Sequence, residues 1–195
     1  DTTSSASVAQ SLVGFGRHIA PILWDAYQEM PEKARGALEN ELLRQADIPT
    51  FEILYAGLLQ TDEYIQRRAV SMLSRLINRT TVSLHMEVIE AHAAPEREAI
   101  AKALHDTRNL EEFCGLVLWM SPEERRLLVE LVCGEDALAY ESFLIQALRL
   151  DDPDIIRKVL AVFRQNPERD YRESLVTALG STDESVVIET IEYFS

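Results

Sequence analysis

The chain has 195 residues, of which 47% are hydrophobic, and a formal net charge of −14 at pH 7. The sequence contains no run near the ~18 apolar residues that a membrane span requires, and such acidity argues against a broad nucleic-acid surface, which needs Lys and Arg to neutralise phosphates. We therefore expect a folded cytoplasmic protein that inserts into no membrane and binds no nucleic acid.

Prolines and glycines predict most of the helix boundaries. Gly134 and Gly180 follow apolar runs and suit the left-handed residue past a helix end. No segment alternates as a strand would, so we expect an all-α protein. Five prolines each precede a charged stretch that runs into apolar residues three and four apart, as in a first helical turn: Pro31, Pro95, Pro122, Pro153 and Pro167.

Connections between the expected helices are short, so neighbouring helices should pack antiparallel as hairpins. In chain order, the pattern predicts helices over residues 7–18, 21–29, 31–46, 50–60, 62–77, 81–93, 95–106, 109–120, 122–133, 136–149, 153–165, 167–179 and 183–194.

Three segments are variants of one another, namely residues 61–70, 151–160 and 182–191. Each places an acidic turn just before an amphipathic helix. Their aspartates Asp62, Asp152 and Asp183 lie 90 and then 31 positions apart, so the first gap holds three units of about the length of the second. Such a period, built from helices alone, predicts a right-handed α-solenoid of stacked antiparallel hairpins.

The repeat pattern also predicts the domain organisation. Residues 1–6 form a polar stretch that we interpret as a flexible leader. Residues 7–46 lack the acidic turn and are interpreted as an N-terminal helical cap, which a solenoid needs to cover its apolar end. Residues 47–195 are expected to form one continuous repeat array.

One segment carries a family resemblance. Residues 148–158 read Leu-Arg-Leu-Asp-Asp-Pro-Asp-Ile-Ile-Arg-Lys. This resembles the core of a HEAT repeat, in which a leucine-rich first helix leads through an Asp-Pro-Asp turn into a second helix bearing Val-Arg or Ile-Arg. The match is partial around Asp183, where Ile188 replaces the Arg, and poor between residues 80 and 134.

An arginine recurs near the start of each second helix. In HEAT repeats the equivalent Arg commonly pairs with the turn Asp of an adjacent repeat, so the resemblance implies a structural ladder of Arg–Asp pairs that includes Asp62, Asp152 and Asp183. One unit has Ala93-Ala94 where the acidic turn should be. The arginines of this line lie 30, 29 and 31 residues apart: Arg67, Arg97, Arg126 and Arg157.

Solenoids are surfaces that hold other molecules, so we expect a non-enzymatic interaction or scaffold module. It should bind a protein segment along the concave face formed by the second helices, and no cofactor is expected. The cations beside the ladder are the alternative to a purely structural role, because they would present a basic strip to an acidic partner. The candidate contacts flank the apolar core positions: Arg68, Arg75, Arg125, Lys158 and Arg164.

Histidines and cysteines give little support for a metal site or a nucleophile. His85 and His92 are seven apart on one expected helix, hence about 10.5 Å apart by helical rise, too far to share one ion without a third element. Cys114 and Cys133 lie in apolar stretches that favour buried free thiols, and the apolar helix around Cys114 should raise the pKa of its thiol.

Two groups of helical-repeat enzymes are the alternative to a binding module. The alkylpurine DNA glycosylases resemble this chain in architecture, and they need a basic concave face around an extruded base. The bilin lyases of phycobilisomes have repeats near thirty residues, but no residue here identifies a bilin site. A spacer or oligomerisation element of a larger protein is a third interpretation.

Overall fold

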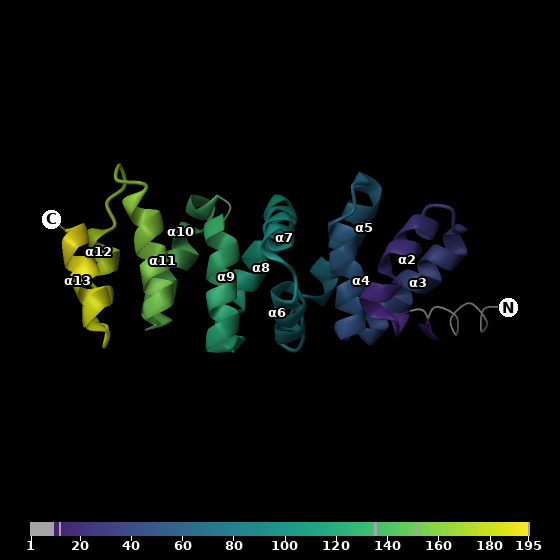
Figure 1. Ribbon diagram of the computed structural model, residues 1–195, viewed down its shortest axis with the longest axis horizontal. Coiled ribbons are helices and arrows are strands. Elements are labelled where there is room, and N and C mark those ends of the chain that lie inside the picture. Colours follow the sequence, from purple (N-terminus) through teal and green to yellow (C-terminus); the bar gives the residue numbers. More distant parts are fainter. Residues whose placement is uncertain (1–9, 12, 135, 151, 195) are drawn as a thin grey trace. The chain divides into compact units, whose positions relative to one another are not determined.

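The computed structural model describes residues 10–11, 13–134, 136–150 and 152–194 (Figure 1). Every regular element in these ranges is helical, which confirms the all-α class predicted from the sequence. Within the same ranges, none of the helices combines the length and the apolar character that crossing a bilayer demands. The expected leader, residues 1–6, lies outside the described residues.

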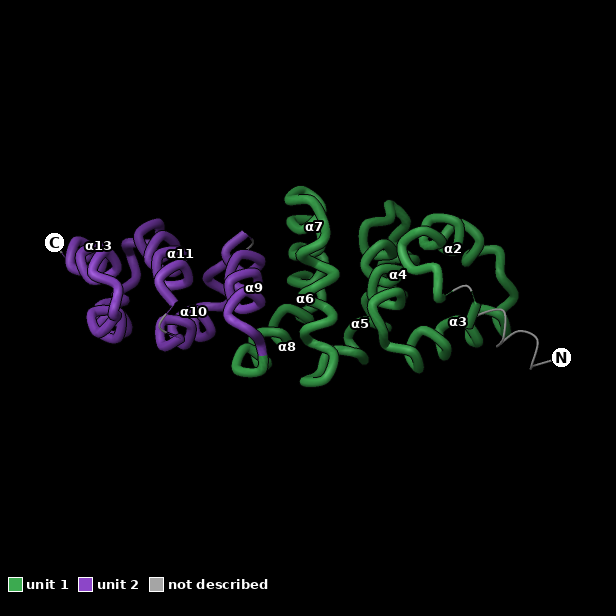
Figure 2. The backbone as a smooth tube through the Cα atoms, turned by 60° about the horizontal axis from the view of Figure 1, so that its bottom comes forward, with its two compact units in different colours: residues 1–119 green, residues 120–195 purple. Residues whose placement is uncertain are grey.

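The chain forms two compact units, residues 1–119 and residues 120–195 (Figure 2). The first unit contains, in chain order, η1 (Gly16–His18), α2 (Ala20–Tyr27), α3 (Glu32–Gln45), α4 (Ile48–Leu58), α5 (Glu63–Leu76), α6 (Val82–Glu90), α7 (Ala94–Asp106), α8 (Asn109–Gly115) and η2 (Val117–Trp119). The boundary expected at residue 46 falls inside this unit, where α3 packs on both α4 and α5.

Helix α4 forms the centre of the first unit. It is apolar on nearly all sides, and such a helix is stable only where neighbours cover it. Helices α2, α5 and α6 all pack on it. The indole of Trp24, which is fully buried, donates a 2.9 Å hydrogen bond to the carbonyl oxygen of Ile53. Gly57 makes this contact possible, because a Cβ atom there would come within 2.8 Å of the Trp24 ring.

The second unit contains α9 (Pro122–Gly134), η3 (Ala137–Tyr140), α10 (Glu141–Ala147), η4 (Leu148–Leu150), α11 (Pro153–Arg164), α12 (Arg172–Leu175), η5 (Ala178–Gly180) and α13 (Glu184–Tyr193). Helix α11 packs on α9 on one side and on α13 on the other. It is strongly amphipathic, and Ile155, Val159, Leu160 and Phe163 on its apolar face are fully buried.

The three repeated aspartates are N-cap residues. Asp62 accepts a hydrogen bond from the backbone N–H of Ile65, and Asp152 accepts one from that of Ile155. Asp183 does the same for Val186. Each side chain thus satisfies a backbone donor that would otherwise have no partner in the first turn. The acidic turns therefore define the starts of α5, α11 and α13, within a residue of the predicted positions.

The prediction of one helix over residues 167–179 is wrong. Residues 166–171 form a loop, and the helix begins only at Arg172. The physical reason is Tyr171, which is buried and stacks on Phe163 with ring centroids 3.7 Å apart and ring planes within 6°. Asp170 then accepts a hydrogen bond from the backbone N–H of Arg172, so the helical turn starts after the stacked ring rather than at Pro167.

Three other expected helices are also shorter or interrupted. Residues 109–120 divide into α8 and η2 instead of one continuous helix. Residues 136–149 divide into η3, α10 and η4 instead of one continuous helix. The segment expected as a helix over residues 7–18 ends in the short 3-10 turn η1, and residues 7–9 and 12 lie outside the described residues. Gly16 adopts φ of +52°, which brings its backbone against the carboxylate of Glu52 and would strain other residues.

Candidate functional site

Two arginines of the predicted ladder contact the turn aspartate of the next hairpin. The Arg126 Nε lies 2.8 Å from Oδ2 of Asp152, and Arg157 Nη2 lies 3.3 Å from Oδ1 of Asp183. Arg157 also lies 3.4 Å from Oε1 of Glu189 on α13. Hydrogen bonds from Ser185 and the backbone, together with Arg157, lower the pKa of Asp183. These pairs join α9 to the start of α11, and α11 to α13.

Of the other two arginines, Arg67 departs from the predicted ladder. Arg67 contacts Glu63 on its own helix at 2.5 Å, and both side chains are three-quarters exposed. Asp62 accepts from the side-chain amide of Gln28. Arg97 donates to the carbonyl oxygen of His92. The physical reason is visible in the sequence, because the turn after Arg67 carries Ala93 and Ala94, which offer no carboxylate.

We expect the Arg157–Asp183 pair to contribute measurably to the stability of the second unit. Arg157→Ala should lower its melting temperature by a few degrees, because the pair is only half-exposed and a neighbouring carboxylate shares the guanidinium. A double-mutant cycle with Asp183→Asn, which keeps the N-cap oxygen, isolates the pair. Arg149→Ala, which removes an exposed arginine of η4, is the control. A coupling indistinguishable from zero in thermal unfolding would contradict the structural role.

Arg68, a candidate partner contact, is held within the first unit. Its guanidinium makes a two-pronged contact with the carboxylate of Glu39 on α3, at 2.5 Å, and the hydroxyl of Tyr27 also donates to Glu39. Burial and the Glu39 carboxylate raise the pKa of Tyr27 to about 12. Burial alone would raise the pKa of Glu39, but the hydrogen bonds from Arg68 and Tyr27 keep it below its usual value. This arrangement ties α5 to α3.

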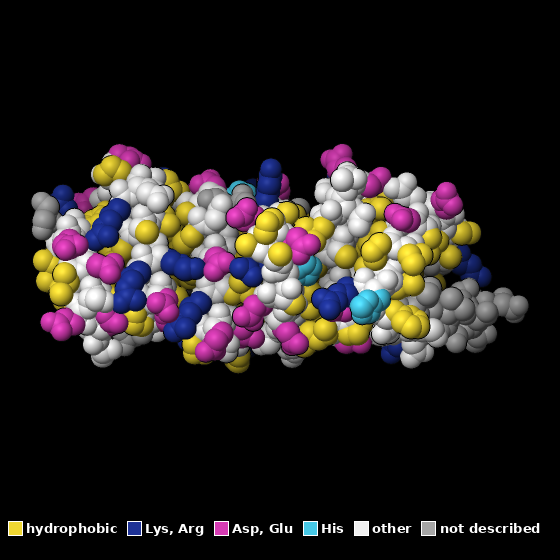
Figure 3. All heavy atoms as spheres, in the orientation of Figure 1, with side chains coloured by type: hydrophobic (Ala, Val, Ile, Leu, Met, Phe, Trp, Pro, Cys, Tyr) yellow, Lys and Arg dark blue, Asp and Glu magenta, His cyan; other side chains and the backbone are white. Residues whose placement is uncertain are grey.

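Two further candidate contacts lie on the face formed by α9, α11 and α13, where cationic and anionic side chains alternate (Figure 3). Lys158 lies 3.1 Å from Oε2 of Glu130 on α9. Arg164 donates to the carbonyl oxygen of Glu189. The cations of this face therefore neutralise neighbouring carboxylates, which disfavours a basic strip. Of the last two candidates, Arg75 is exposed on α5 and Arg125 is half-buried on α9.

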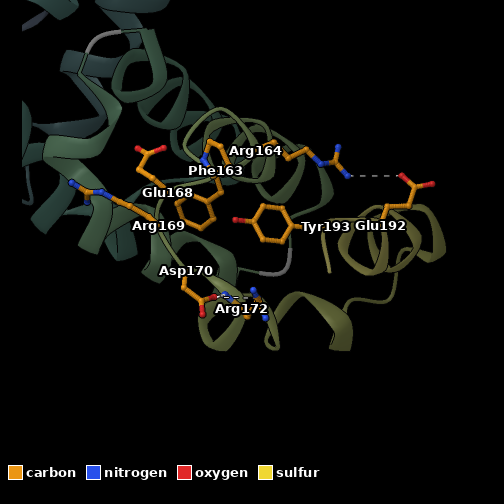
Figure 4. Close-up of a pocket in the computed structure, with 9 residues that line it drawn as sticks. Phe163, Arg164, Glu168, Arg169, Asp170, Arg172, Glu192 and Tyr193 are labelled. Atoms are coloured by element: carbon orange, nitrogen blue, oxygen red, sulfur yellow. Dashed lines mark hydrogen bonds and ion pairs between the residues drawn. The ribbon is translucent and has the colours of Figure 1, made fainter. Parts of the chain in front are cut away.

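Arg164 also borders a cavity of about 510 Å³ at the end of the second unit (Figure 4). The ring of Tyr193 points toward Phe163 across it, and the guanidinium of Arg164 extends toward Glu192. The charged lining of this cavity consists of three arginines and three carboxylates. The lining therefore carries no net charge and offers no electrostatic preference for a charged ligand. These residues are Arg164, Arg169, Arg172, Glu168, Asp170 and Glu192.

A larger groove of about 720 Å³ lies in the first unit, where the beginning of α5 faces the end of α7. Its floor is apolar, with Leu58 and Leu59 from the end of α4 and Val70 from α5. Ala99 and Ala103, four residues apart on α7, form one wall. The rims are charged: Glu63 and Arg67 on α5, and Lys102 and Asp106 on α7. An apolar floor between charged rims matches the amphipathic surface of a helix.

The missing ladder contact coincides with this groove. Arg67, which has no turn carboxylate to reach, lines the groove beside Glu63. In the second unit, by contrast, α11 packs directly on both α9 and α13. The groove is not among the features predicted from the sequence, although Ala93-Ala94 in place of the acidic turn is a signal that could have indicated it.

Burial shapes the chemistry of His85 and of both cysteines. Among those residues, no group of three His, Cys, Asp or Glu side chains is placed to hold a metal ion. Burial raises the pKa of Cys114 to about 12 and that of Cys133 to about 11, so both thiols stay protonated at neutral pH. His85 is fully buried. Its Nε2 faces the carbonyl oxygen of Leu76 at 3.4 Å and carries the proton, so Nδ1 accepts a hydrogen bond from the Tyr55 hydroxyl.

No protein-family model matches the chain, and no curated protein matches it in sequence.

Proposed function

We propose that this chain is a non-enzymatic, HEAT-like α-solenoid module that binds a helical segment of a partner protein. The observation that carries the proposal is the groove between α5 and α7. The cap aspartates and the Arg–Asp contacts of the second unit support the HEAT-like part, because they reproduce the turn and the ladder that the resemblance implies. In this proposal the paired hairpins act as scaffold and the groove receives the ligand.

The shape of the groove favours an amphipathic helix as the bound segment. Two helices flanking an apolar floor leave a channel into which the side-chain ridge of a third helix fits. Ala99 and Ala103 are small, so a ligand helix approaches the backbone of α7 closely. Arg67 and Lys102 stand on opposite rims, and so do Glu63 and Asp106. A ligand helix with both acidic and basic residues beside its apolar stripe therefore finds partners on each side.

A single substitution in the groove tests the proposal. Ala99→Arg places a long charged side chain on the groove wall, and Arg forms helix nearly as well as Ala, so the fold should persist. We expect the variant to bind its partner at least about tenfold more weakly. The measurement is quantitative capture of partners by the tagged chain from native extract, followed by calorimetry with the helical peptide that the captured protein supplies.

The matched control is Ala161→Arg. Ala161 is an exposed alanine on α11 in the second unit, so this variant makes the same change in size and charge away from the groove. It should bind like the unmodified chain. Equal partner binding by the Ala99→Arg variant, with its fold verified by circular dichroism, would contradict the groove as the binding site.

A further inference from the structure

Three arginines hold the same position in their helices. Arg67, Arg126 and Arg157 are the fifth residues of α5, α9 and α11, respectively. Arg126 lies 2.8 Å from Asp152, the N-cap residue of α11. Arg157 lies 3.3 Å from Asp183, the N-cap residue of α13. In both places an arginine near the start of one helix therefore contacts the N-cap carboxylate of the second helix of the next hairpin.

Arg67 lacks this contact. The second helix of the hairpin after α5 is α7, and its N-cap residue is Ala93, which has no carboxylate. Ala93 lies 31 residues after Asp62, the N-cap residue of α5, and the same interval separates Asp152 from Asp183. The groove lies where α5 faces α7. The missing turn carboxylate and the groove therefore belong to the same two helices.

The Arg67 guanidinium is able to take a carboxylate from a ligand. It contacts Glu63 on its own helix, and both side chains are 75% exposed, so this pair contributes little to stability. A pair within the helix also leaves room for a second carboxylate. Arg157 lies 3.4 Å from Asp154 on its own helix while it contacts Asp183. Arg67 can therefore keep Glu63 and bind a ligand carboxylate as well.

We propose that the groove binds a helix whose N-terminal turn carries an aspartate, and that this aspartate replaces the missing turn carboxylate by pairing with Arg67. The inference rests on the proposed function and adds the chemistry and the direction of the bound segment. Because Arg126 and Arg157 contact the N-terminus of the helix with which they pair, the ligand helix begins beside Arg67. A carboxylate at that end also caps the ligand helix and complements its dipole.

The chain itself supplies a probe with this chemistry. Residues 151–165 combine the acidic turn with the amphipathic helix that follows it, and in the folded chain Asp152 of this segment pairs with Arg126. A fluorescent peptide of this sequence is titrated with the full chain, and its anisotropy is measured. We expect a micromolar dissociation constant, because a short helix must become ordered when it binds. Ala99→Arg in the full chain should abolish the binding.

Charge inversion tests the contact with Arg67. Arg67→Glu in the full chain should weaken binding of the peptide at least about tenfold, because repulsion replaces attraction. A peptide with Asp152→Lys should bind the unmodified chain equally weakly, and binding should recover when this peptide meets the Arg67→Glu variant. A peptide with Asp152→Asn keeps the N-cap oxygen and loses only the charge, so it should bind about threefold more weakly.

The matched control is Arg75→Glu, which makes the same charge change at an exposed arginine of α5 that does not line the groove. It should bind the peptide like the unmodified chain. Three outcomes would overturn the inference: no binding of the peptide, binding that Ala99→Arg leaves unchanged, or binding that Arg67→Glu leaves unchanged.

The inference and the proposed function fail in different ways. If Ala99→Arg abolishes binding of the peptide and Arg67→Glu does not, the groove stands as a binding site and the contact of Arg67 with an acidic turn is wrong. The proposed function itself fails when the partner captured from native extract binds the Ala99→Arg variant as well as it binds the unmodified chain.

Discussion

Leu160→Ala is expected to lower the free energy of unfolding of the second unit by about 2 to 5 kcal/mol. Leu160 is 0% exposed on the apolar face of α11, the helix that packs on both α9 and α13. Truncation removes buried methyl groups and leaves a cavity that the flanking helices fill only in part. Because both tryptophans of the chain lie within residues 1–119, the measurement should use far-UV circular dichroism in denaturant and hydrogen exchange of α11.

Leu118→Ala is the control for this substitution. It deletes the same atoms from a leucine that is 74% exposed, so the stability should change by less than about 0.5 kcal/mol. If Leu160→Ala leaves the free energy of unfolding equally unchanged, the assignment of Leu160 to the buried interface between the helices of the second unit is wrong.

Acidification from pH 6.5 to pH 4 is expected to cost the first unit about 3 kcal/mol through His85 alone. Burial lowers the pKa of this histidine from 6.5 to about 4. The rings of Phe51, Tyr55 and Phe113 surround the imidazole. Between these two pH values the unfolded chain binds a proton that the folded chain does not. The stabilising effect of neutral His85 is therefore complete above pH 6.5 and falls as the pH approaches 4.

His85→Gln tests the assignment, because glutamine does not titrate in this range. The slope of unfolding free energy against pH, followed by tryptophan fluorescence in denaturant, should flatten between pH 6.5 and 4.5. Carboxylates with lowered pKa values, such as that of Glu39, contribute below this window. A variant with an unchanged slope would show that a different group controls the acid sensitivity of the first unit.

Local signals in the sequence were sufficient for much of the fold. Asp62, Asp152 and Asp183 begin helices because a short acidic side chain satisfies backbone donors wherever it precedes a helix. The 31-residue spacing of Asp152 and Asp183 identifies equivalent positions, and the contact of Arg157 with Asp183 follows from that alignment. Such features depend on residues close in sequence or one repeat apart, which a pattern search detects.

Features that depend on packing between distant residues were not predictable in the same way. Nothing local to Tyr171 indicates that its ring stacks on Phe163 and delays the start of α12. The contact between Tyr55 and His85 joins residues on α4 and α6, and the pattern of either helix alone does not show it. For the groove, the sequence contained an indirect sign, because Ala93-Ala94 departs from the acidic-turn pattern at the start of α7, the helix that forms one wall of the groove.

Asp152 and Asp183 each serve two helices at once. Each side chain caps the helix that follows it and also accepts an arginine from the helix before. Unfolding of α13 therefore removes the carboxylate partner of Arg157 on α11. Unfolding of α11 likewise removes the carboxylate partner of Arg126 on α9. The stability of each helix therefore depends on the helix next to it, as in a one-dimensional chain of coupled units. Helices α9, α11 and α13 should consequently unfold in one cooperative transition rather than fray singly from the end.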